Sequence, residues 1–141
     1  MSGLAMGAVL QIGTAMADLA SIHPWLDEAA GPDLPATLLN AMHVALEEAV
    51  MNIAMHGYGQ GEGVIALRFD REGETVLLTL EDTARPFNQA EAPPPPQAAS
   101  LEKASIGGRG LKLLRHYCKD IGYEHVGGRN RLKLRFPLLA A

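Results

Sequence analysis

Residues 43–59 read HVALEEAVMNIAMHGYG, and this stretch decides the fold. Up to His56 it contains no glycine or proline, and its alanine, leucine and methionine residues favour a helix. The two glycines that follow His56 are typical of a helix C-terminus. The sequence therefore predicts a helix that begins between Pro35 and Thr37 and ends at His56.

One face of this helix carries a row of polar side chains. Residues four positions apart lie on the same face of a helix, so Glu48, Asn52 and His56 align. A carboxylate can accept a proton from an attacking hydroxyl group, and a carboxamide oxygen is a hard ligand suited to Mg²⁺. The residues alone leave two alternatives open, a solvated row or a functional one. We expect His56 to cap the helix, because a cation suits the C-terminal end of the helix dipole.

Length and composition indicate one globular domain over residues 1–141, with 48% hydrophobic and 20% charged residues. The formal net charge of -4 argues against a nucleic-acid-binding protein that works by neutralising phosphates. Gln11 and Asp18 interrupt the apolar N-terminal run, so we expect no signal peptide, no membrane association and a cytoplasmic location. Cys118 has no second cysteine to pair with, and we expect it to pack as a small apolar side chain.

The other elements follow from periodicity and turn residues. Residues 13–30 have helical spacing with a kink or break at Pro24, and residues 111–119 form an amphipathic helix. Four runs with strand character form two hairpins, residues 64–69 with 75–82 and residues 121–126 with 131–136, the second closed by a turn at 127–130. Hairpins separated from helices predict an α+β two-layer sandwich, in which a mixed, mostly antiparallel sheet is covered on one face by helices.

A long segment without helical or strand character separates the two hairpins. Residues 88–106 are rich in Ala, Pro, Glu, Gln and Ser, and four consecutive prolines at 93–96 exclude a helix or a central strand. A long loop inside a compact domain is typical of a lid or a disordered insert.

Two further stretches carry candidate chemistry. Asp82 stands where a predicted strand ends and a turn begins, and its carboxylate either caps the turn or accepts a hydrogen bond from an exocyclic amine such as that of adenine. Residues 107–110 read GGRG and precede a predicted helix, where backbone N–H groups and the helix dipole favour an anion. Glycines at this position also serve as simple turn residues, and the stretch matches neither the P-loop nor the dinucleotide-binding pattern.

Together and in this order, the three stretches resemble the N box, G1 box and G2 box of the GHKL (histidine-kinase-like) ATPase superfamily. Residues 48–58, EAVMNIAMHGY, are similar to the pattern Glu-Ala-Val-x-Asn-x-x-x-His-Gly-Tyr of the anti-sigma-factor serine/threonine protein kinases in that superfamily. The resemblance covers residues 35–136. It implies the Bergerat fold, with ATP bound between the N-box helix and a flexible lid at residues 88–106.

The resemblance also implies roles for individual residues. Glu48 would be the general base that orients the attacking serine hydroxyl group of a protein substrate. Asn52 would ligate the Mg²⁺ that bridges the ATP phosphates, and Asp82 would bind the adenine amino group. The other implied nucleotide-binding positions are Ala84, Gly107, Gly108, Arg109, Gly110 and Leu111.

The implied function is that of an ATP-dependent serine protein kinase and regulatory anti-sigma factor. Such a protein phosphorylates a small anti-sigma-factor antagonist and sequesters a sigma factor when unphosphorylated antagonist is absent. A histidine kinase catalytic domain is disfavoured, because no long helical hairpin with a phosphoacceptor histidine is evident in the sequence.

The sequence departs from the family pattern at two places. Ala84 stands where the G1 box usually has glycine, and residues 131–134 offer no threonine near the adenine. These departures keep open a second function, a nucleotide-responsive binding protein of the same fold without turnover. A homodimer also stays open, since the N-terminal strand through which relatives pair is not evident in residues 7–12. Trp25 and Leu26 are the expected exposed apolar contacts for a partner.

Overall fold

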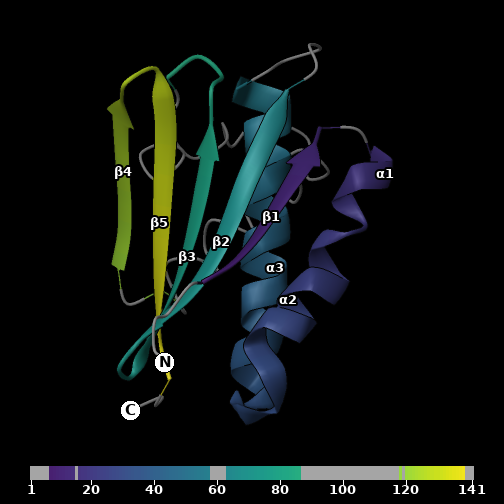
Figure 1. The fold of residues 1–141 in the computed structure, drawn as a ribbon, viewed down its shortest axis with the longest axis vertical. Helices are drawn as coiled ribbons and strands as arrows, with labels where there is room; N and C mark the ends of the chain where they lie inside the picture. The colour runs from purple at the N-terminus through teal and green to yellow at the C-terminus, as the bar shows by residue number, and fades with distance from the viewer. Residues whose placement is uncertain (1–6, 15, 58–62, 87–117, 119, 139–141) are drawn as a thin grey trace, which may run out of the picture.

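A computed structural model describes residues 7–14, 16–57, 63–86, 118 and 120–138 of the chain. The elements in chain order are β1 (Ala8–Gly13), α1 (Met16–Leu19), α2 (Ile22–Ala30), the 3₁₀ turn η1 (Gly31–Asp33), α3 (Ala36–Asn52), the π-helical turn η2 (Ile53–Gly57), β2 (Val64–Glu72), β3 (Thr75–Asp82), β4 (Asp120–Val126) and β5 (Arg129–Pro137). Helices α2 and α3 lie along one face of the sheet (Figure 1). The predicted α+β sandwich with helices on one face is confirmed.

The sheet contains five strands in the order β1-β2-β3-β5-β4. All four pairings between the described strands are antiparallel, and the sequence predicted a mixed, mostly antiparallel sheet. Strand β1 was not predicted. It pairs with β2 along its whole length, from Ala8 opposite Phe69 to Gly13 opposite Val64. Val9 and Ile12 favour a strand, whereas Ala8 and Gly13 at its two ends do not, so the pairing with β2 fixes the limits of this strand.

The helix predicted over residues 13–30 is two helices. Residue 13 belongs to β1, and the break between α1 and α2 lies at Ala20 and Ser21, before Pro24 rather than at it. A proline ring clashes with the carbonyl group four residues earlier, which here is that of Ala20. The Ser21 hydroxyl group donates a hydrogen bond to the Asp18 carbonyl oxygen over 2.7 Å and stabilises the end of α1. Pro24 itself lies in the first turn of α2, where a proline is tolerated.

Helix α3 begins at Ala36, as the sequence predicted. Its regular α-helical part ends at Asn52, and residues Ile53–Gly57 continue as the π-helical turn η2. A π turn contains more residues than an α turn, and such turns are frequent at functional sites. The spacing of four that aligns Glu48 with Asn52 therefore does not extend beyond Asn52, and the side chain of His56 lies outside the described part of the chain.

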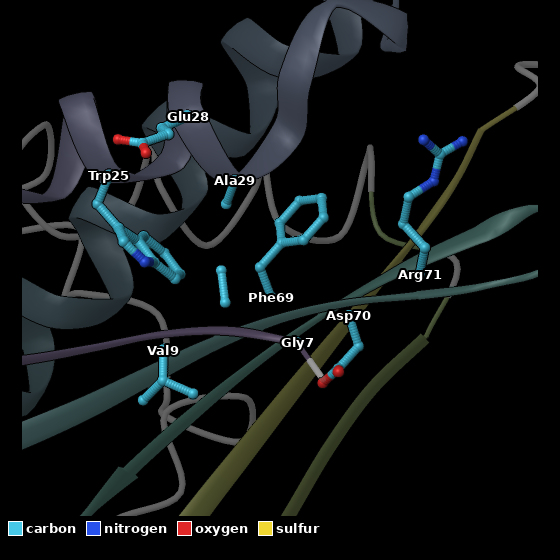
Figure 2. Close-up of a pocket in the computed structure, with 9 residues that line it drawn as sticks. Gly7, Val9, Trp25, Glu28, Ala29, Phe69, Asp70 and Arg71 are labelled. Atoms are coloured by element: carbon cyan, nitrogen blue, oxygen red, sulfur yellow. The ribbon is translucent and has the colours of Figure 1, made fainter. Parts of the chain in front are cut away.

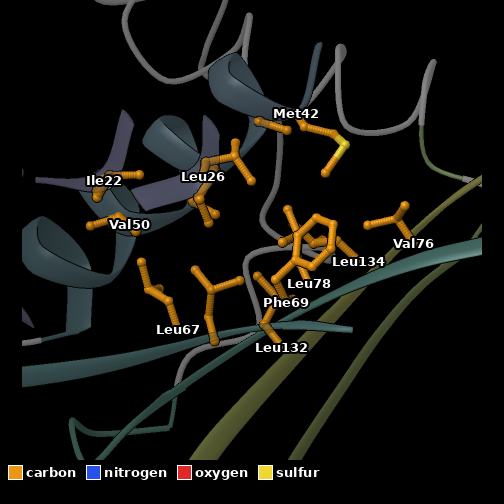
Figure 3. Packing of buried hydrophobic residues seen from close by; sticks show 14 of the residues in the cluster. Ile22, Leu26, Met42, Val50, Leu67, Phe69, Val76, Leu78, Leu132 and Leu134 are labelled. Carbon is orange, nitrogen blue, oxygen red and sulfur yellow. The ribbon is translucent and has the colours of Figure 1, made fainter. Parts of the chain in front are cut away.

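The core lies between α2, α3 and one face of the sheet (Figure 3). Alternate residues of β2, β3 and β5 point into this layer, which is the period of two expected of a strand. On α3 the buried residues follow helical spacing instead. The fully or almost fully buried members include Ile22, Leu26, Met42, Leu46, Val50, Leu67, Leu78, Leu80, Leu134 and Phe136.

Polar contacts fix α2 against α3 on the side away from the sheet. The Nδ1 atoms of His23 and His43 are 2.8 Å apart, so one ring donates a hydrogen bond to the other. The Nε2 atom of His43 lies 2.7 Å from Oδ1 of Asp27. Glu47 is exposed, with one carboxylate oxygen 3.5 Å from Nε2 of His23. This chain of contacts sets which flank of α3 faces α2.

We expect the core side of α3 to carry most of its contribution to stability. Val50 is fully buried, whereas Val44, on the same helix, is 43% exposed. Replacing Val50 with alanine removes buried methyl groups and leaves a cavity, which lowers the free energy of unfolding by about 2 kcal/mol. The matched control V44A changes it by less than about 0.5 kcal/mol, because surface substitutions in helices have small effects. Urea denaturation measures both, and equal losses would contradict the assigned helix orientation.

Candidate functional site

The predicted pair Glu48 and Asn52 lies on one flank of α3, and both side chains are half-buried. At about 100° of rotation per residue, they lie about 140° and 180° around the helix from His43. Since His43 contacts α2, Glu48 and Asn52 lie on the flank turned away from α2. The fold therefore keeps the two residues together, and on a different side of the helix from Glu47.

Asp82 is the last residue of β3 and is only 5% exposed. It follows Leu78 and Leu80 at alternate positions, so its carboxylate lies on the face that the helices cover. A buried carboxylate needs hydrogen-bond donors. The backbone N–H of Ala84 donates to Oδ1 over 2.9 Å, and Nδ2 of Asn130 donates to the same oxygen over 2.8 Å.

Asn130 is a site residue that sequence reasoning missed. The turn predicted over residues 127–130 is too long, because the two glycines 127 and 128 alone connect β4 to β5. Both have positive φ values, 62° and 78°, as a two-residue hairpin turn of type I′ requires. Asn130 therefore belongs to β5, directly opposite Asp82. The Gly-Gly pair is a known two-residue hairpin signal, and this signal could have placed Asn130 on the same face as Leu132.

Asn130 also holds the turn that follows Asp82. Its Nδ2 atom lies 3.1 Å from the carbonyl oxygen of Ala84 and 3.1 Å from that of Arg85. The Tyr123 hydroxyl group donates to its Oδ1 atom. Asn130 is 5% exposed, so these contacts compensate the burial of its polar amide group. The side chain thus connects three strands, β3, β4 and β5.

Ala84 fits its position without strain. No residue other than glycine in the described ranges has a positive φ value, so the turn after β3 does not require a glycine at position 84. Ala84 is buried, and its small side chain leaves the turn compact. The departure from the usual G1 box is therefore compatible with the geometry of this turn.

The end of α3, the end of β3 and the β4–β5 turn lie at the same end of the molecule (Figure 1). The register agrees, because Asp82 pairs with Ile65 at the start of β2 and with Asn130 at the start of β5. The structure thus brings Asp82 to the same end of the domain as the row that contains Asn52. The predicted lid at residues 88–106 lies outside the described residues. So do five of the predicted nucleotide-binding residues, Gly107, Gly108, Arg109, Gly110 and Leu111.

Sequence similarity decides the family. Residues 14–136 match the family described as histidine kinase-like ATPase domain. The chain belongs to this family.

Two curated relatives are a protein kinase and an anti-sigma factor by name. The chain is 32% identical over 112 residues to the serine/threonine-protein kinase BtrW of Bordetella bronchiseptica, across 78% of this chain and 79% of that protein. It is 26% identical over 109 residues to the anti-sigma F factor of Anoxybacillus flavithermus, across 77% of this chain and 68% of that protein. These names agree with the kinase and anti-sigma-factor resemblance of residues 48–58.

Solved structures support the histidine kinase-like fold. The histidine kinase domain of the blue-light activated histidine kinase EL346 from Erythrobacter litoralis superposes with a TM-score of 0.55 at 18% identity, over 86% of this chain. The same kinase in a longer form gives a TM-score of 0.57 at 19% identity. This chain spans 60% and 41% of those two structures, so the likeness concerns the fold.

Membership of an ATPase family indicates that this domain binds ATP. In the described part of the chain, no group of three or more His, Cys, Asp or Glu side chains could hold a metal ion. Mg²⁺ in nucleotide sites is usually held by one or two protein oxygens together with substrate phosphates. The carboxamide oxygen of Asn52 fits this kind of donor set. Among the described helices, none is both long enough and apolar enough to cross a membrane.

A separate cavity of about 660 Å³ lies between α2 and the region where β1 begins (Figure 2). Its lining includes Trp25, Ala29 and Phe69, and Phe69 is four residues along β2 from Ile65, the residue opposite Asp82. The cavity is therefore distinct from the Asp82 end. The prediction that Leu26 is an exposed contact is wrong, because Leu26 is fully buried in the core, while Trp25 is half-buried beside the cavity.

Cys118 packs against the core as predicted. Burial, and to a lesser degree the nearby Asp120 carboxylate, raises the pKa of its thiol to about 12. Since only the thiolate reacts with alkylating agents, its reactive fraction at pH 8 is about a thousandfold below that of an ordinary cysteine. We expect iodoacetamide to modify the folded protein at least about a hundredfold more slowly than the urea-unfolded chain. Mass spectrometry over time measures both rates, and equal rates would show that the thiol is accessible.

Proposed function

We propose that this protein is an ATP-dependent serine/threonine protein kinase that acts as a regulatory anti-sigma factor. The observation that carries the proposal is that Glu48 and Asn52 share the flank of α3 turned away from α2, at the end of the domain where Asp82 is buried. The names of the two curated relatives support the same assignment. A protein that only bound a nucleotide would have no need of a base at position 48.

We assign the adenine contact to Asp82. Both hydrogen bonds from Ala84 and Asn130 go to Oδ1, and neither uses Oδ2. A carboxylate oxygen accepts a hydrogen bond from the exocyclic amine of adenine, whereas it would repel the carbonyl oxygen that guanine carries at the equivalent position. Asp82 Oδ2 would therefore select adenine nucleotides.

We assign the phosphate end of the site to Asn52 and Glu48. The carboxamide oxygen of Asn52 would hold Mg²⁺, which supplies positive charge to the ATP phosphates when bound. The carboxylate of Glu48 would orient the serine hydroxyl group of the protein substrate and accept its proton. As the serine oxygen forms its bond to the γ-phosphorus, the bond from that phosphorus to the β–γ bridging oxygen breaks and ADP leaves. The helix keeps base and metal ligand one turn apart, which fixes their relative position.

The proposed partners are an anti-sigma-factor antagonist that carries the serine and a sigma factor. The alternative function, nucleotide-responsive binding without turnover, rested partly on Ala84 in place of a glycine. The turn after β3 accommodates Ala84 without a positive φ value, and β5 supplies Asn130 as a polar partner beside Asp82. Both observations support nucleotide binding, which the two functions share, and Glu48 is the residue that favours the kinase over the alternative.

Substitution of Glu48 tests the kinase directly. We expect E48Q to lower phosphoryl transfer from Mg-ATP to a serine-containing antagonist by about 10² to 10⁴-fold, because a glutamine cannot accept the proton. Calorimetric titration should give the same Kd for Mg-ATP as wild type, since Glu48 does not hold the nucleotide in this assignment.

The neighbouring variant E47Q is the matched control, because Glu47 is exposed on the side of α3 that faces α2. It should transfer phosphate at the wild-type rate. Unchanged transfer by E48Q would remove Glu48 as the base. ATP binding by wild type without transfer to any antagonist would favour the alternative function, and no binding at millimolar Mg-ATP would exclude the kinase.

We further propose a homodimer that pairs through β1. This strand lies at one edge of the described sheet, and edge strands present backbone groups that can pair with another chain. Its Val9 side chain is 58% exposed. Sedimentation equilibrium should give twice the mass of the chain for wild type, and V9K should shift the equilibrium to monomer because a lysine on an edge strand opposes pairing. A monomeric wild type would contradict the proposed dimer.

A further inference from the structure

We infer that Asn130, held in place by Tyr123, is a positioning residue that sets the direction of the Asp82 carboxylate and so the preference for adenine over guanine nucleotides. The inference rests on the proposed adenine contact of Asp82. It concerns three residues from three strands whose polar groups meet at the same end of the sheet. Asn130 and Tyr123 do not themselves contact the nucleotide in this assignment.

The orientation of the Asn130 amide group follows from its neighbours. An amide oxygen cannot donate a hydrogen bond, so the Tyr123 hydroxyl group must be the donor in its contact with Oδ1. Nδ2 then points toward Asp82, as a donor should. If the amide were flipped, its oxygen would face the Asp82 carboxylate and two carbonyl oxygens, all of which are acceptors. These three acceptors thus select one of the two amide orientations, and the Tyr123 hydroxyl group, which can donate or accept, holds Oδ1 in that orientation.

Two donors then fix Oδ1 of Asp82 from different directions. One is the backbone N–H of Ala84, within the turn, and the other is Nδ2 of Asn130, from the neighbouring strand. With one oxygen held twice, rotation of the carboxylate about its Cβ–Cγ bond is restricted, and the direction of Oδ2 becomes defined. A preorganised acceptor discriminates between ligands better than one that can rotate to suit them.

The same amide group also fixes the turn itself. Nδ2 lies 3.1 Å from the carbonyl oxygens of both Ala84 and Arg85, so the backbone after Asp82 is held by β5 as well as by its own Ala84 N–H. These contacts depend on the short Gly127-Gly128 turn, which places Asn130 opposite Asp82. In this inference the β4–β5 hairpin therefore contributes directly to adenine recognition, through Asn130.

The test compares the binding of Mg-ATP and Mg-GTP by the full chain. Calorimetry gives the two Kd values, and their ratio reports selectivity. In N130A we expect Kd for ATP to rise about tenfold while Kd for GTP changes less than about twofold, because loss of one hydrogen bond to a charged group is worth about one factor of ten. In Y123F, which removes only a hydroxyl group, the rise for ATP is about threefold. The control N40A, at an exposed position of α3, should behave as wild type.

The ratio separates positioning from mere stabilisation. A purely structural role would lower the melting temperature but leave the ratio of the two Kd values unchanged in the folded protein. If folded N130A has the same ratio of Kd for GTP to Kd for ATP as wild type, the inference is wrong. If N130A does not fold, the same ratio in Y123F decides. A wild type that does not prefer ATP would also overturn the inference. Failure of the kinase proposal alone gives a different result. Wild type would then prefer ATP but transfer no phosphate to an antagonist, and N130A would still lose the preference for ATP.

Discussion

Burial of the Asp82 carboxylate is the constraint on which the rest of the site depends. It lies at the helix-covered face of the sheet, next to a core of leucine and phenylalanine side chains, and is 5% exposed. A charged group in this position is costly unless donors surround it. One donor comes from the turn after β3, and the other comes from β5, so the carboxylate couples the shape of the turn to the register of the sheet.

The sequence was sufficient where the signal is local. Helix α3 and the β2–β3 hairpin follow from residues close together in the chain, and Glu48 and Asn52 are paired by helical spacing alone. Strand β1 was missed because it is short and begins and ends with residues of low strand propensity, Ala8 and Gly13, and because its partner β2 lies more than fifty residues later. The break before α2 was displaced for a different reason, since Pro24 acts on the carbonyl group of Ala20 rather than on its own position.

Asn130 shows how part of the site depends on the length of a single turn. The proposed role of Asn130 depends on its pairing with Asp82 on β3. Asn130 lies within β5 and can pair only if the β4–β5 turn has two residues rather than four. Asn130 is also an acceptable turn residue, which favours the longer turn, and only the Gly127-Gly128 pair indicates the two-residue turn. The sequence correctly placed Asp82 at the end of its strand. The phosphate-binding role of residues 107–110 stays a prediction.

The flank of α3 on which Glu48 and Asn52 lie is determined by the packing of the helix. Ala41, Ala45 and Ala49 form a row of small side chains on α3, each 6% exposed or less, so the helix backbone lies close to the sheet. On another flank, His23 and His43 connect α3 to α2. The alanine row and the His23–His43 contact together fix how α3 is rotated about its axis in this structure. A larger side chain at Ala45 or Ala49 would lift or turn the helix, and would redirect the proposed base and metal ligand without touching either of them.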